Sequence, residues 1–392
     1  MLAHVGIALV CFLLRVAHSL EVGARPVFVA GATGYIGRAV VKELVSRGVP
    51  TIAAVRKEAE VAAVTQSYLL GSTVKELSIV DSAAVDECFS QTRPAAVICC
   101  AASRNGLPKE SWEVDYGAGK NLLESLIRHG DKKTSTDMPH YVMLSAFCCG
   151  KPRLQFQYAK LKLEEDLREA SKEGKGVLSH SIVRPTAYFK SLDGQLEAAK
   201  KGSSVMYFGD GTCSANAIGD KDLAKFLVDC ALSPGSIGMV DATRNVGGPD
   251  VPAVTKLQQI GMLFDVLKTP EDERKTMSIP VGVFDVLLGV FSFAKKVTET
   301  FGARELATKC DDAGEIVNIV KYYATEPMVA TGHGEVQGSM RLSDHFQNLK
   351  GGLREVDQYT TTMGVVDLVM KQKYESSKSV FVGGDEVEGS QS

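Results

Sequence analysis

Gly31-Ala-Thr-Gly34-Tyr-Ile-Gly37 is the segment that decides the fold of this 392-residue chain. It follows the apolar run at residues 27–30 directly and opens a stretch with helical periodicity, which is the context a glycine-rich motif needs. Gly31 permits a tight turn, Gly34 lets the backbone approach a pyrophosphate, and Gly37 lets the helix pack closely on the strand. Free N–H groups at the start of the helix attract phosphate oxygens. The segment predicts a dinucleotide-binding loop made of Gly31, Thr33, Gly34, Tyr35, Ile36, Gly37 and Arg38.

Short apolar strands alternate with amphipathic helices on both sides of this loop, a pattern typical of right-handed βαβ units in a parallel sheet. After residues 27–30 we expect strands at 51–55, 76–80, 95–102, 140–145 and 178–183, and helices at 36–47, 82–90, 113–129 and 154–172. This order predicts an α/β fold with a Rossmann-type doubly wound parallel sheet of six or seven strands. The NAD(P)-binding Rossmann domain should span residues 25–185.

The remaining segments differ from this alternating core. Residues 186–330 contain glycine-rich turns and two longer apolar stretches, which indicates a smaller C-terminal substrate-binding region that completes the fold. Residues 350–392 lack apolar periodicity and predict a disordered tail. Residues 1–20 contain an apolar run of ten residues followed by small residues, which predicts a targeting signal that is too short to span a bilayer.

The composition limits the classes of partner. The chain has 44 basic and 47 acidic residues, a formal net charge of -3, so no overall positive field draws it to nucleic acid. Its nine cysteines form no Cys-x-x-Cys pair, and no histidine lies at zinc-ligand spacing. We therefore expect free thiols, no metal site and no nucleic-acid partner. The sequence does not indicate an oligomeric state.

The end of the second expected strand indicates the choice of cofactor. An acidic residue there would bind the ribose 2′-hydroxyl of NADH, but the strand ends in Arg56 and Lys57. A guanidinium at Arg56, with a second at Arg38, fits the 2′-phosphate of NADPH, although Glu58 argues against it. Asp81 is expected either to border the adenine or to cap a helix. Ala101 and Pro185 complete the expected cofactor contacts.

Ser145, Tyr158 and Lys162 have the spacing of a Ser…Tyr-x-x-x-Lys catalytic set. Because Tyr158 and Lys162 are four residues apart on an expected helix, the ammonium can lie beside the phenol and also reach the ribose hydroxyls. Tyr158 would then donate a proton and Lys162 would tune it. Lys160 is a competing lysine on the same helix.

Several longer segments resemble one family. The GxxGxxG spacing is similar to that of the extended and atypical short-chain dehydrogenases/reductases. The NADPH-dependent 8-vinyl reductases of divinyl chlorophyllide, an NmrA-like branch, resemble this chain over residues 27–330. The segments are Ala101-Ala-Ser-Arg-Asn-Gly106, Ser111-Trp-Glu-Val-Asp-Tyr116, Leu154-Gln-Phe-Gln-Tyr-Ala-Lys-Leu-Lys162, Val183-Arg-Pro-Thr-Ala-Tyr-Phe-Lys-Ser-Leu192, Phe208-Gly-Asp-Gly211, Gly247-Gly-Pro249, Ile279-Pro280 and Tyr322-Tyr-Ala-Thr-Glu326.

The resemblance implies an enzyme that reduces the vinyl group on ring B of a divinyl (proto)chlorophyllide to ethyl with NADPH, in a plastid reached through the secretory route. Plant members of the family differ from this chain at Tyr158, so the proton source stays open between Tyr158, solvent and another group. The apolar residues 284–293, followed by Lys295 and Lys296, favour either contact with a porphyrin or a membrane surface or an ordinary buried helix. The alternatives to this enzyme are a non-catalytic NmrA-like NAD(P)-binding regulator and an atypical reductase of another conjugated substrate.

Overall fold

A seven-stranded parallel sheet forms the centre of the protein in the computed structural model, which describes residues 25–56, 63–130, 138–172 and 177–350. The strand order is β3-β2-β1-β4-β5-β6-β9, so the order reverses between β1 and β4. The strands are β1 (Val27–Ala30), β2 (Thr51–Val55), β3 (Thr73–Glu76), β4 (Ala96–Cys99), β5 (His140–Leu144), β6 (Ser179–Pro185) and β9 (Ala242–Val246). The predicted Rossmann-type doubly wound sheet is confirmed.

One expected strand lies elsewhere. The segment predicted at residues 76–80 follows β3 instead of forming it, because residues 73–76 pair with β2 from Ile52 to Val55. Leu77 and Ile79 pack as partly buried side chains against the core beside β1. Their apolar signal therefore came from a packed loop.

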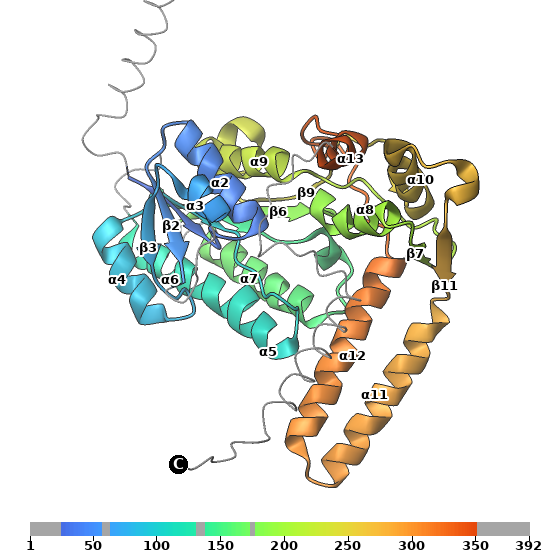
Figure 1. The fold of residues 1–392 in the computed structure, drawn as a ribbon. Coiled ribbons are helices and arrows are strands. Elements are labelled where there is room, and N and C mark those ends of the chain that lie inside the picture. Colours follow the sequence, from blue (N-terminus) through green and yellow to red (C-terminus); the bar gives the residue numbers. More distant parts are fainter. Residues whose placement is uncertain (1–24, 57–62, 131–137, 173–176, 351–392) are drawn as a thin grey trace, which may run out of the picture.

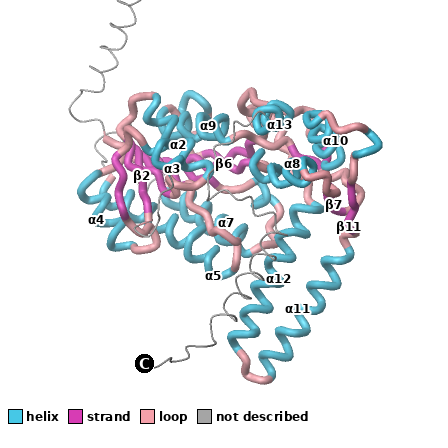
Figure 2. The backbone as a smooth tube through the Cα atoms, in the orientation of Figure 1, coloured by secondary structure: helices cyan, strands magenta, loops and turns pink. Residues whose placement is uncertain are grey.

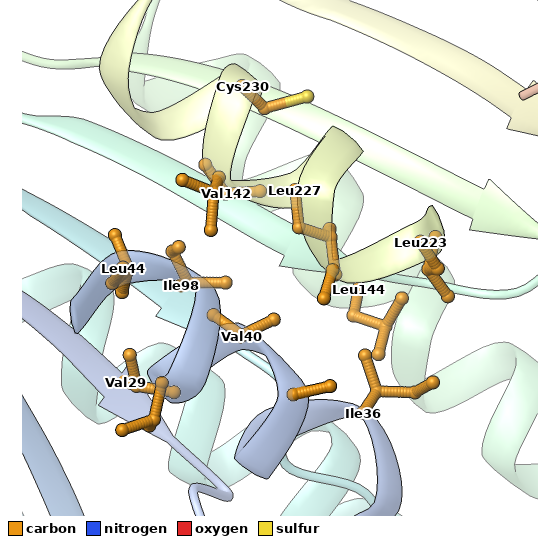
Figure 3. Close-up of a cluster of buried hydrophobic side chains, with 14 of the residues drawn as sticks. Val29, Ile36, Val40, Leu44, Ile98, Val142, Leu144, Leu223, Leu227 and Cys230 are labelled. Carbon is orange, nitrogen blue, oxygen red and sulfur yellow. The ribbon is translucent and has the colours of Figure 1, made fainter. Parts of the chain in front are cut away.

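Helices cover both faces of the sheet (Figure 1, Figure 2). On one face, α2 (Tyr35–Ser46) and α9 (Asp220–Leu232) pack on the side chains of alternate strand residues such as Val29 and Ile98, and Figure 3 shows this cluster. On the other face lie α4 (Ser82–Thr92), α6 (Gly119–His129) and α7 (Gln155–Ala170), which cover Phe28 and its neighbours. The period-two alternation of the strands thus supplies two separate cores.

The helix expected at residues 113–129 has an irregular beginning. It is preceded by α5 (Pro108–Glu110) and starts with the π-helical segment Ser111–Ala118 before α6 continues it. Segments of π-helix often occur at functional sites, because the wider turn re-aims side chains. Asp115 in this segment is buried.

The chain after β6 builds a second, smaller layer and also returns to the main sheet. Because β9 is a strand of the large sheet and α9 packs on one of its faces, this unit extends past the predicted boundary at residue 185. The other elements after β6 are α8 (Asp193–Lys200), β7 (Val205–Phe208) paired with β11 (Thr276–Ile279), β8 (Ser214–Ala215) paired with β10 (Val254–Thr255), α10 (Lys256–Leu267), α11 (Gly282–Thr300), α12 (Arg304–Thr325) and α13 (Leu342–Lys350). Helix α3 (Ala63–Leu69) lies earlier in the chain, between β2 and β3. Short 3-10 turns occur at Phe147–Gly150, Phe189–Leu192, Pro234–Ile237 and Glu271–Glu273.

Two predicted segments lie outside the described residues, namely the targeting signal at 1–20 and nearly all of the tail at 350–392. In the part of the chain that is described, every helix is too short or too polar to cross a bilayer.

Candidate functional site

The glycine loop adopts a conformation that only glycine allows at two of its positions. Gly31 has a φ of +73°, and a Cβ at Gly37 would lie 2.0 Å from the carbonyl oxygen of Gly31. Helix α2 therefore begins in direct contact with the turn that leaves β1. A Cβ at Gly34 would meet a single atom within 4 Å, the same carbonyl oxygen at 3.2 Å, and Gly34 is exposed.

The same loop fits a dinucleotide phosphate. No side chain caps the N-terminus of α2, and its first turn contains no acidic residue. An open backbone surface at Gly34 beside an uncapped helix N-terminus is the arrangement that binds a pyrophosphate. Thr33 and Tyr35 of the loop are half-buried, whereas Ile36 and Arg38 are buried.

A cavity of about 270 Å³ opens at the carboxyl edge of the sheet beside this loop. It is formed by the backbone that follows β4, by residues that follow β5, and by side chains from α7 and α12. Its lining consists of residues 100–106 and 144–146 together with Asp115, Phe156, Lys160, Tyr188, Ile319 and Tyr323. Because the strand order reverses between β1 and β4, the carboxyl edge beside the cavity is the topological switch point, where doubly wound folds bind their ligands.

Lys160 is the buried cation of the cavity. Its Nζ atom lies 3.0 Å from Asp115 Oδ1 and donates a hydrogen bond to the Leu144 carbonyl oxygen at 3.4 Å. Asp115 also accepts a hydrogen bond from the Ser103 backbone N–H at 3.2 Å. Burial by itself would lower the pKa of Lys160, but the Asp115 carboxylate outweighs that effect and raises the pKa above its ordinary value. The side chain is therefore a fixed ammonium group.

Ser145 is in the cavity, as its place in the predicted catalytic set requires, but its hydroxyl proton is already used. It donates to Glu164 Oε1 at 2.6 Å, and Glu164 also binds Arg184 at 2.5 and 2.9 Å and Arg168 at 2.7 Å. Burial by itself would raise the pKa of Glu164, but the hydrogen bonds from Arg184 and Ser145 outweigh it and lower the pKa. Toward a ligand, Ser145 can only accept a hydrogen bond.

Tyr158 and Lys162 do not line the cavity. Tyr158 is 44% exposed and donates to the Pro152 carbonyl oxygen at 3.3 Å, while Lys162 forms exposed ion pairs with Glu165 at 2.7 Å and Asp166 at 3.1 Å. Two residues along an α-helix turn a side chain by about 200°, so 158 and 162 face away when 156 and 160 face the cavity.

The pair that shares the cavity face at i and i+4 is Phe156 and Lys160. Phe156 therefore occupies the position where the Tyr-x-x-x-Lys pattern has its tyrosine. One sequence signal could have found this register: Ala159, Leu163 and Leu167 form the buried stripe of α7, and Lys160 and Glu164 lie directly beside it. Asp115 and Arg184 carry no comparable signal, because their roles depend on partners far away in the sequence.

The residues expected around the adenosine phosphate lie on α2 and at the end of β2. Arg56 is exposed at the end of β2, and Lys57 and Glu58 lie outside the described residues. The Arg38 guanidinium lies over the rings of Tyr68, at 5.0 Å, and Tyr35, at 5.9 Å.

Of the remaining expected cofactor contacts, Ala101 lines the cavity and Pro185 is the buried last residue of β6. Asp81 caps α4 by accepting hydrogen bonds from Ala83 N at 3.0 Å and Ala84 N at 3.2 Å, so of its two expected roles it has the one at the start of a helix. Over the described residues, no group of three or more His, Cys, Asp or Glu side chains could hold a metal ion.

Comparisons with known proteins agree with this geometry. The NAD(P)H-binding family matches residues 31–234. The chloroplastic divinyl chlorophyllide a 8-vinyl-reductase of Arabidopsis thaliana is 37% identical over 319 residues, which cover 77% of this chain and 69% of that protein. The protein of the same name from Cucumis sativus is 40% identical over 77% of this chain and 68% of its own length.

A solved structure shows the same fold at low sequence identity. The UDP-glucose 4-epimerase of Thermotoga maritima superposes with a TM-score of 0.52 at 18% identity, over 65% of this chain and 85% of the epimerase. At that identity the likeness concerns the fold alone, and the family assignment rests on the sequence relatives. The chain therefore belongs to the divinyl chlorophyllide a 8-vinyl-reductase family of NAD(P)H-binding proteins.

Proposed function

We propose that this protein reduces the 8-vinyl group of a divinyl (proto)chlorophyllide a to an ethyl group with NADPH, as a step of chlorophyll synthesis. The plant relatives carry the name of this activity. The observation that carries the proposal is the cavity beside the glycine loop, in which the buried Lys160 and its partner Asp115 form a fixed charged pair. Bound NADPH supplies a hydride, and a proton completes the ethyl group.

The residues present fit NADPH. The backbone around Gly34 and the N-terminus of α2 would hold the pyrophosphate, and Arg56 with Arg38 would hold the 2′-phosphate. Lys160 would bind the ribose hydroxyls next to the nicotinamide, since it is the ammonium group that reaches the cavity. We assign this role to Lys160 in place of Lys162.

The residues around Lys160 keep the cavity in one geometry. Asp115 holds the ammonium in place, and the buried Glu164 connects Ser145 to Arg184 across β5 and β6. Because these groups are hydrogen-bonded before any ligand enters, they can hold reactants without reorganising.

We propose that the proton comes from a tyrosine outside α7. Phe156 has no proton to give, and Tyr158 is outside the cavity. Among the described residues that line the cavity, the tyrosines are Tyr188 and Tyr323. Loss of solvent around each phenol raises its pKa, and Cys148 raises the pKa of Tyr323 further, so both hydroxyls keep their protons at neutral pH. We assign the proton to one of these two hydroxyls.

The size of the cavity determines how a tetrapyrrole can enter. Pockets that enclose drug-sized ligands measure roughly 300–1,000 Å³, and this cavity of about 270 Å³ is smaller. It therefore takes the vinyl-bearing edge of the macrocycle, while the rest of the flat ring lies at the mouth. Ile319 and Tyr323 from α12 line the cavity and would contact the ring.

The test is product formation. Purified protein is incubated with divinyl chlorophyllide a and NADPH, and the 8-ethyl product is followed by its Soret shift and its chromatographic retention. NADPH-dependent product supports the proposal. Tight NADPH binding without turnover of any divinyl pigment would instead support the NmrA-like regulator, which Phe156 at the tyrosine position favours.

The location follows the relatives, which are named chloroplastic, so we place this protein in a plastid. We further propose that residues 1–20 direct it there through the secretory route. A fluorescent protein fused behind residues 1–24 should reach the plastid in an alga whose plastid is enclosed by endomembrane, and cytosolic fluorescence would contradict this route. We also propose that the protein makes a peripheral contact with membranes.

A further inference from the structure

Helices α11 and α12 form an antiparallel hairpin that projects from the body of the protein (Figure 1). On the side of α11 that faces α12, the Cβ of Phe291 approaches the Cβ position of Gly314 to 4.0 Å. Ion pairs between Asp285 and Lys321, at 2.5 Å, and between Lys295 and Asp311, at 2.8 Å, join the two helices. The hairpin is therefore a defined two-helix unit.

The other side of α11 is apolar and exposed. Its residues recur at helical spacing and leave between 37% and 71% of each side chain uncovered; we call them the apolar face, which consists of Val283, Val286, Leu287, Val290, Phe293 and Val297. Phe284 is the buried residue of this helix. An ordinary helix packed on a sheet buries such a stripe, so the buried-helix alternative is wrong for residues 284–293. An exposed apolar stripe of this length indicates an interaction site.

We propose that the apolar face of α11 docks on a lipid bilayer surface. The uncovered aromatic rings lie toward the hairpin tip, with Phe293 71% and Phe301 83% exposed. Lys296 and Arg304 are exposed next to them, and the anionic Glu299 and Glu305 are exposed at the same tip. Exposed apolar side chains along one side of a helix are the pattern of helices that lie in the membrane interface, and Lys296, which follows the apolar stripe, could contact an anionic headgroup there.

A second copy of the chain fits this surface less well. A helix of 19 residues is about 28 Å long, and its apolar strip, about 10 Å wide, offers on the order of 300 Å². A stable protein interface uses about 800 Å² per partner. Lipid insertion needs no such minimum, because each apolar side chain that enters the bilayer contributes separately.

The hairpin also connects this face with the cavity. Ile319 and Tyr323 of α12 line the cavity, and the Ile319 side chain lies 3.0 Å from the Cβ position of Gly106. A docked hairpin would thus attach the cavity to the bilayer surface through α12, so that a flat apolar pigment could pass from the bilayer to the cavity along the hairpin. This last step rests on the proposed function, whereas the docking itself does not.

The test is flotation of the full chain with vesicles of phosphatidylcholine that contain phosphatidylglycerol. The double variant Val290→Ser with Phe293→Ser should bind vesicles on the order of tenfold or more weakly, because it removes two inserted side chains. Leu70→Ser is the matched control, since Leu70 is 73% exposed on the turn after α3 and should leave flotation unchanged. Lys296→Gln should weaken binding by roughly fivefold on these vesicles and leave binding to pure phosphatidylcholine unchanged.

Three outcomes would overturn the inference. The first is a wild-type chain that does not float, and the second is a double variant that floats like the wild type. The third is self-association in sedimentation velocity that the double variant loses while neither protein binds vesicles, which would assign the face to a second copy. Product formation from detergent-dispersed pigment is measured in parallel. If it is absent while flotation persists, the proposed function fails and the docking stands.

Discussion

Replacing Lys160 with methionine, with Lys162→Met as the matched control, tests which of these two lysines of α7 contacts the cofactor. Lys160 is paired with Asp115, whose side chain is 1% exposed, and the ion pair spans 3.0 Å. Removing one partner of a buried ion pair leaves the other charge uncompensated and costs about 3–5 kcal/mol of folding stability. The Lys162 side chain pairs with Glu165 and Asp166 on the surface, so its replacement should leave the unfolding midpoint unchanged.

The effect on cofactor binding follows from the same geometry. A hydrogen bond from a charged donor contributes about 1.5–3 kcal/mol, so Lys160→Met should weaken NADPH binding roughly 10- to 150-fold. Because the orphaned Asp115 could produce part of this loss by unfolding the site, the double variant Lys160→Met with Asp115→Asn is also measured. It should regain stability and still bind NADPH weakly.

Two measurements decide between Lys160 and Lys162. Urea unfolding is monitored by circular dichroism, and NADPH titration is monitored by fluorescence. The reasoning is refuted if Lys162→Met weakens NADPH binding while Lys160→Met does not. That result would return the ribose contact to Lys162 and the proton to Tyr158.

Three further predictions concern the loop, the core and the proton. Gly37→Ala places a Cβ 2.0 Å from a backbone oxygen of the loop and should abolish NADPH binding. Gly194→Ala has open space around its Cβ and should leave NADPH binding unchanged. Equal NADPH binding by the two variants would contradict the loop geometry. Burial lowers the pKa of His140 to about 4, so the unfolded state takes up a proton first as the pH falls. About 3 kcal/mol of stability, fully present above pH ~6.5, should therefore be lost progressively between pH ~6.5 and ~4. His140→Gln should flatten urea midpoints over that range, and an unchanged slope would show that other groups cause it. Of Tyr188→Phe and Tyr323→Phe, one should lower single-turnover reduction by about 10²–10⁴-fold without altering NADPH affinity, and full rates in both would assign the proton to solvent.

Part of the candidate site could be predicted because it depends on local sequence. The glycine loop is encoded within seven residues, and Gly37 allows the same close approach that its spacing predicts. Ser145 could be placed in the cavity because it follows a strand that the apolar run identifies. Lys160 was harder to assign, because the Tyr-x-x-x-Lys pattern is met by Tyr158 and Lys162, two residues further along the same helix. The choice between the two lysines depends on which side of α7 is buried.

The sequence alone determined the parallel sheet, the nucleotide loop and the family, because alternating apolar patterns and short motifs are set by neighbouring residues. Tertiary structure decided the face of α7 that meets the cavity, since burial is a property of the packed helix and not of its spacing. It also decided that Glu164 meets Arg184 and that Asp115 meets Lys160, pairs whose partners come from different elements. It left α11 exposed as well, because a helix buries its apolar face only where another surface is near enough to cover it.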